Sequence, residues 1–171
     1  MDGLRGIAAL SVVVFHFMEW IYPIETNFIG YGFLAVDFFF CLSGFVIAYA
    51  YDTRISKMGI RSFFISRLIR LHPLVVAGAV LGLIGLLADP FVNHSDTLST
   101  ASLILIFVAS LLMIPLPIVE IRSFNLFGLN APGWSLFWEY VANVFYALVL
   151  VRLPRWALAI LLLIAAGCIV S

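Results

Sequence analysis

Residues 32–51 read GFLAVDFFFCLSGFVIAYAY, a stretch of 20 residues with one charged side chain, Asp37. A helix needs about 20 largely apolar residues to cross the hydrocarbon core of a bilayer, which is roughly 30 Å thick. The stretch has that length and that composition. It is therefore predicted to be a transmembrane helix.

The composition of the whole chain supports a membrane protein. Of its 171 residues, 64% are hydrophobic and only 11% are charged, whereas soluble domains carry about 25% charged residues. A small soluble domain has no core large enough to hide that apolar excess. The net charge of +0 argues against a nucleic-acid partner. Cys41 and Cys168 lie in apolar stretches and are predicted to be small buried residues, and no Cys/His spacing predicts a metal site.

Six apolar stretches predict an all-α fold, a polytopic transmembrane helix bundle that forms a single domain over residues 1–171. The predicted spans are Leu4–Tyr22, Gly32–Tyr51, Leu74–Ala88, Ala101–Ile118, Gly133–Val151 and Trp156–Val170.

The basic residues predict the orientation of this bundle. Five of them lie in the connection between residues 52 and 72, and the connections near Thr26 and Asn93 contain no Lys or Arg. Because Lys and Arg concentrate in cytoplasmic loops, the N-terminus is expected to be cytoplasmic. The last apolar stretch reaches Ser171 without a polar flank, so we expect the chain to be incomplete at its C-terminal end.

The first span holds two ionisable residues that form a candidate site. Arg5 and His16 are 11 residues apart, which places them within about 20° of one helix face and roughly 16 Å apart along the axis. Glu19 follows His16 at i+3 and is placed to orient the imidazole. A functional role for His16 and a structural one, in which it bonds a neighbouring helix, both stay open.

Asp37 in the second span lies at a depth close to that of His16 by rise per residue. An Asp–His pair is one interpretation, with the carboxylate fixing the tautomer of the ring. A structural hydrogen bond between helices is the alternative. Ser43 and Gly44 are expected to permit close helix packing.

A basic amphipathic stretch, RSFFISRLIRLHP at residues 61–73, precedes the third span. Arg67 and Arg70 are at i and i+3 and are expected to share a face. The stretch is typical of a helix that lies in the membrane interface and binds anionic lipid. A cradle for a phosphorylated ligand is the alternative. Within the third span, Gly78, Gly82 and Gly85 form a small-residue face that predicts helix packing.

The fifth span carries a polar stripe. Ser135, Glu139, Asn143 and Tyr146 follow one another at steps of four, four and three residues, so they lie on one helix face. The stripe either joins this helix to its neighbours or lines a substrate cavity.

Taken in order, four motifs of this chain resemble those of the family-3 membrane acyltransferases, which O-acylate surface carbohydrates. They are DGLRGIAALSVVVFH from Asp2, VDFFFCLSGFVIAY from Val36, RLIRLHP from Arg67 and PGWSLFWEYVANVFYAL from Pro132. The resemblance implies a multi-pass protein of a bacterial inner membrane, in contact with membrane lipid. It implies acyl-CoA, with acetyl-CoA expected, as donor and a carbohydrate or lipid-linked glycan as acceptor.

The resemblance also implies roles for particular residues. It assigns acid–base or covalent catalysis to His16 and supporting catalytic roles to Asp37 and Glu139. It assigns donor binding to Arg5, Arg67 and Arg70, and the substrate pocket to Trp134, Ser135 and Asn143. Two rival interpretations stay open: a piece of a membrane transporter or flippase, and a non-catalytic membrane subunit.

Overall fold

The protein is described by a computed structural model that covers residues 2–19, 21–23, 26–89, 99–116 and 126–170. The described residues form helices and turns and contain no strand. Their helices are α1 (Asp2–Glu19), α2 (Leu34–Tyr51), α3 (Ile55–Leu87), α5 (Thr100–Leu111), α6 (Gly133–Leu148), the short 3₁₀ helix η2 (Leu150–Arg152) and α7 (Arg155–Val170). The predicted all-α fold is confirmed.

Three of these helical segments are long and apolar enough to cross a membrane: Leu34–Tyr51, Ile55–Leu87 and Gly133–Arg152. They correspond to the predicted second, third and fifth spans. Helix α1 is as long as α2, but it carries three charged residues, Asp2, Arg5 and Glu19. It is therefore not one of these three segments. Helix α7 has 16 residues, so it is about 24 Å long at 1.5 Å per residue.

The predicted fourth span is shorter than expected. Helix α5 has 12 residues, about 18 Å of helix, and it ends well before Ile118. The backbone leaves the helix at Met113, whose φ is 55°, and the amide of Leu116 then donates to the carbonyl of Leu126 over 2.9 Å. Left-handed backbone at a non-glycine residue cannot continue an α-helix.

The third helix is longer than predicted, because the basic stretch and the third span form one element. Helix α3 runs for 33 residues and continues through Pro73, with one break in helical geometry at Gly59 (φ 78°, ψ 154°). A glycine adopts this positive φ without the steric cost that a side chain would add. The basic stretch is therefore not a helix separate from the third span.

The described chain divides into two compact units, Met1–Lys57 and Met58–Ser171. In the first unit α1 and α2 pack together. Phe15 is 5% exposed, and its ring contacts that of Phe33 edge-on at 6.1 Å between centroids. Ser43 is buried, as expected of a packing residue. Gly44 lies open instead, with no other atom near the position of a Cβ.

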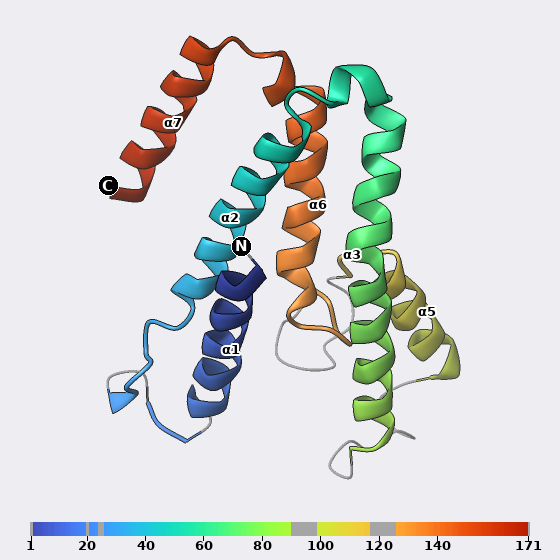
Figure 1. The fold of residues 1–171 in the computed structure, drawn as a ribbon. Coiled ribbons are helices and arrows are strands. Elements are labelled where there is room, and N and C mark those ends of the chain that lie inside the picture. The colour runs from blue at the N-terminus through green and yellow to red at the C-terminus, as the bar shows by residue number, and fades with distance from the viewer. Residues whose placement is uncertain (1, 20, 24–25, 90–98, 117–125, 171) are drawn as a thin grey trace. The chain divides into compact units, whose positions relative to one another are not determined.

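The second unit is built around α3. One core cluster joins Val75 of α3 to Met113 and Phe127, and a second joins Leu86 of α3 to Ile106 of α5 and to Leu129. The first cluster therefore ties α3 to a residue just after α5, and the second ties it to α5 itself. Both also tie α3 to the segment that precedes α6. Figure 1 shows α3 and α6 running in opposite directions.

The glycine face of α3 is confirmed at two of its three positions. A Cβ on Gly82 would overlap the carbonyl of Leu129, and one on Gly78 would overlap the side chain of Asn130. The segment before α6 thus packs directly on the backbone of α3. Gly85 lies beyond this contact and faces open space. Cys41 is exposed rather than buried, and the side chain of Cys168 is outside the described residues.

Candidate functional site

A buried arginine joins α3 to α6. The Nε of Arg67 donates to Oδ1 of Asn143 over 2.8 Å, and its Nη2 donates to Oε1 of Glu139 over 3.4 Å. Arg67 is 2% exposed and Asn143 is 1% exposed. Because a buried charge needs both a counter-charge and hydrogen bonds, this arrangement meets the requirements of a stable ion pair away from water. We call these three residues the α3–α6 polar contact.

Asn143 is held in place from its own helix. Its Nδ2 donates to the main-chain carbonyl of Glu139 over 2.7 Å, one turn earlier. With the amide nitrogen bonded there, the amide oxygen is directed at Arg67. The side chain therefore acts as a fixed acceptor between two helices, and it has little freedom to turn toward a mobile ligand.

Three of the four residues in the predicted polar stripe of α6 lie on the side that faces α3. Glu139 and Tyr146 accompany Asn143 on the side of α6 that packs on α3: Tyr146 is 8% exposed, and its ring contacts that of Phe63 in α3 at 5.8 Å. Ser135, the first member, donates its hydroxyl to the carbonyl of Pro132 over 2.8 Å. It stabilises the first turn of α6. Trp134, its neighbour, is 47% exposed.

Arg67 and Arg70 differ in surroundings, although they were expected to share a face. Arg67 is buried in the α3–α6 polar contact, whereas Arg70 is exposed. Positions three apart on a helix are about 60° apart around the axis. At the edge of the buried face that angle is enough to turn one guanidinium inward and leave the other outside.

The His16–Glu19 pair lies in the first unit, at the end of α1. The Nδ1 of His16 is 2.9 Å from Oε2 of Glu19, and the two side chains are 60% and 35% exposed. The predicted contact at i+3 is therefore present. Arg5 is half-buried and Asp37 is exposed. Within the described residues, no hydrogen bond or ion pair joins Asp37 to His16, so the carboxylate that contacts the ring is that of Glu19.

Sequence reasoning gave no role to His72 and Tyr140. The hydroxyl of Tyr140 in α6 is 3.5 Å from Nδ1 of His72 in α3, a second and longer polar contact between the same helices. His72 lies in the quoted RLIRLHP motif, and Tyr140 is one residue beyond Glu139 in the stripe. Both residues lie within or beside motifs that the sequence indicated. The sequence did not indicate that their side chains are close together.

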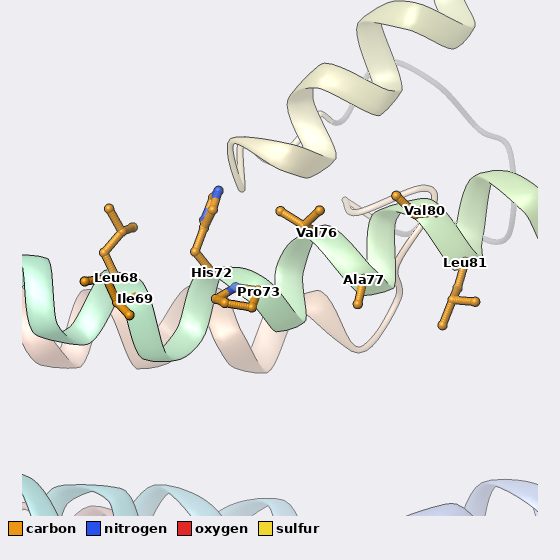
Figure 2. Close-up of a pocket in the computed structure, with 8 residues that line it drawn as sticks. All are labelled: Leu68, Ile69, His72, Pro73, Val76, Ala77, Val80 and Leu81. Carbon is orange, nitrogen blue, oxygen red and sulfur yellow. The ribbon is translucent and has the colours of Figure 1, made fainter.

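An apolar groove of about 880 Å³ runs along α3. Figure 2 shows the eight residues that line it, all from α3, with His72 as their one polar side chain. None of the predicted site residues lines this groove. Its chemistry suits hydrocarbon and does not suit the phosphates of coenzyme A or a sugar. Among the described residues, no three His, Cys, Asp or Glu side chains come together as metal ligands.

Comparisons with known proteins decide the family. The family model of the acyltransferase domain matches residues 1–171. The chain belongs to this acyltransferase family. It is 35% identical to protein 2 in the picA locus of Rhizobium radiobacter over 157 residues, which is 86% of the chain and 79% of that relative. No solved structure matches the chain.

Two further relatives match a smaller part. A protein of Staphylococcus aureus (strain COL), provisionally named an O-acetyltransferase, is 38% identical over 81 residues, 44% of the chain and 12% of that relative. A protein of Bacillus subtilis (strain 168), provisionally named a peptidoglycan O-acetyltransferase, is 37% identical over 79 residues, 43% of the chain and 11% of that relative. The family and these names assign the chain to the O-acyltransferases.

Proposed function

We propose that the chain moves an acetyl group from acetyl-CoA to a hydroxyl of a cell-surface carbohydrate or lipid-linked glycan. The proposed setting is a bacterial inner membrane, with the N-terminus on the cytoplasmic side. Membership of the acyltransferase family supports the reaction class, and the name of the Bacillus relative supports a glycan acceptor. The observation that carries the proposal is the exposed imidazole of His16 with a carboxylate bonded to one ring nitrogen.

In the proposed reaction His16 acts as general base. It takes the proton of the acceptor hydroxyl while the hydroxyl oxygen attacks the thioester carbonyl. The carbon–sulfur bond then breaks, and the thiolate of coenzyme A recovers the proton from the imidazolium. The products are the O-acetyl ester and free coenzyme A, so the histidine returns to its starting state.

Arg70 is the strongest candidate for contact with the phosphates of the donor, because its guanidinium is exposed. A guanidinium matches the geometry of a phosphate through paired N–H donors. Arg5, half-buried on the same helix as His16, is a second candidate. Arg67 is assigned differently: together with Glu139 and Asn143 it holds α3 against α6, and its influence on donor binding acts through that position.

The remaining predicted residues keep supporting roles in the proposal. Trp134, with its partly exposed ring, offers a face on which a sugar or the adenine of the donor can stack. Ser135 fixes the start of α6 beside it. Asp37 is exposed in α2, and its contribution to the acceptor site stays a prediction.

The experiment that tests the proposal uses membrane vesicles that contain the chain and acetyl-CoA labelled in the acetyl group. The expected result is label in a glycan fraction together with release of free coenzyme A in equal amount. Release of coenzyme A without labelled glycan would mean that the proposed glycan is not the acceptor. Absence of both, combined with flux of a glycan precursor across the vesicle membrane, would favour the transporter interpretation and overturn the proposal.

A further inference from the structure

The His16–Glu19 pair defines which nitrogen of the imidazole is available for chemistry, an inference that rests on the proposed function. The Nδ1 is 2.9 Å from Oε2 of Glu19. An ionised carboxylate has acceptor sites only and no proton to give. The proton in this bond therefore belongs to Nδ1. In a neutral imidazole whose Nδ1 carries the proton, Nε2 holds the free lone pair.

We propose that Glu19 is a positioning residue that fixes His16 with its proton on Nδ1, so that Nε2 is the atom that accepts the proton of the acceptor hydroxyl. The carboxylate also gains interaction energy when the ring becomes positively charged during the reaction. Both effects act on the step in which the proton moves, since neither requires Glu19 to touch a substrate.

The surroundings of the ring support this assignment. The bond to Glu19 is the one hydrogen bond described for the His16 ring. The ring of Phe15 lies beside it with centroids 5.2 Å apart, and Phe15 is buried against Phe33. One side of the imidazole is thus held by a packed aromatic ring and one edge by a carboxylate. The Nε2 edge is the part of this 60% exposed side chain that is left for a substrate.

The mundane alternative is a surface ion pair without function. Exposed pairs at i and i+3 contribute little to stability. Stability measurements alone therefore do not separate the two interpretations. A catalytic readout and a direct readout of the tautomer are both needed.

The test compares Glu19→Met, which removes the acceptor at similar size, with Glu19→Gln, which keeps an acceptor oxygen without the charge. Ser11→Ala is the matched control, because Ser11 is on α1 and donates only to the carbonyl of Ile7 in the described contacts. For Glu19→Met we expect kcat to fall about tenfold with KM for acetyl-CoA within twofold of wild type. We expect the kcat of Glu19→Gln to lie between those of Glu19→Met and wild type. The kcat of Ser11→Ala should match that of wild type.

The second readout is the ¹⁵N spectrum of the chain with labelled histidine. In the wild type we expect the His16 signals of a protonated Nδ1 and an unprotonated Nε2. In Glu19→Met we expect a mixture of both tautomers, since no other described bond selects one.

The two readouts separate the failure of this inference from the failure of the proposed function. If the wild type transfers acetyl groups and Glu19→Met has the same kcat, the inference is wrong and the proposed function stands. If the wild type transfers nothing, the proposed function is wrong. The spectrum then still decides whether Glu19 selects the tautomer, and an unprotonated Nδ1 in the wild type would overturn the inference by itself.

Discussion

The α3–α6 polar contact and the His16–Glu19 pair each combine one basic side chain with a glutamate, but they differ in burial and in sequence distance. Arg67 is 2% exposed and its partner Asn143 is 76 positions away. The side chain of His16 is 60% exposed and its partner is three positions away. A buried contact between distant elements holds a structure together, whereas an exposed local pair adds little stability and leaves an atom open for chemistry.

Ionisable residues in the apolar segments of this chain therefore do not share one role. By sequence position Arg67, Glu139 and His16 were all candidates for a functional site. The hydrogen bonds separate them: the first two neutralise each other between helices, and the third presents an imidazole with one nitrogen bonded. The same substitution made in each of the two regions tests this difference in role.

The largest effect on stability is expected from Glu139→Met. This change removes the carboxylate that accepts a hydrogen bond from the buried guanidinium of Arg67. Breaking a buried ion pair in this way costs about 3–5 kcal/mol. The same substitution at Glu19 removes an exposed pair and is expected to cost less than about 0.5 kcal/mol. Thermal unfolding of the purified protein in detergent measures both. Equal losses for the two variants would show that burial does not distinguish the two regions.

A double variant, Arg67→Met with Glu139→Met, serves as the control for this experiment. Replacing both members of a buried ion pair by apolar residues is often neutral or stabilising. We therefore expect it to recover most of the stability lost in Glu139→Met. A double variant that is less stable than either single variant would mean that the charges contribute through contacts other than this pair.

A smaller effect is expected where the segment before α6 packs on α3. Gly82→Ala places a Cβ on the carbonyl of Leu129 and is expected to destabilise the protein by about 1–3 kcal/mol. Gly85→Ala on the same helix is the matched control, because its Cβ would meet no other atom and alanine favours a helix. Denaturant unfolding compares the two. A stable Gly82→Ala variant would contradict the close approach of these segments.

The smallest effect is expected at Arg70, the residue proposed to contact the phosphates of the donor. Arg70→Gln should raise KM for acetyl-CoA about fivefold, which corresponds to about 1 kcal/mol for an exposed charged contact. Its unfolding temperature should stay at the wild-type value. Arg61→Gln is the matched control, since Arg61 is also basic and exposed on α3. A KM change of the same size in both variants would indicate a general effect of surface charge.

The sequence predicted those features that local periodicity and hydropathy determine. The apolar length of residues 34–51 sufficed for a spanning helix, and the spacing of Glu139 and Asn143 sufficed to place them on one face. The contact between His16 and Glu19 follows from the same helical geometry. Each of these features involves residues that a single helix brings together.

The features that the sequence left open depend on contacts between distant segments. Whether Arg67 or Arg70 would turn inward depends on the angle at which α3 meets α6, which hydropathy does not determine. The early end of α5 depends on the left-handed backbone at Met113, a residue type with no preference for that conformation. The sequence showed that Arg67 is a candidate for a buried or binding role. It did not show that its partner is Asn143, 76 positions away.

Acetyl transfer and thermal unfolding, measured in the same preparation of His16→Ala, test whether His16 is the general base. We expect the rate of transfer to fall by about 10²–10⁴, the contribution of a general base. The unfolding temperature should not change, because the His16–Glu19 pair is exposed. A His16→Ala variant that transfers acetyl groups at the wild-type rate would contradict the account.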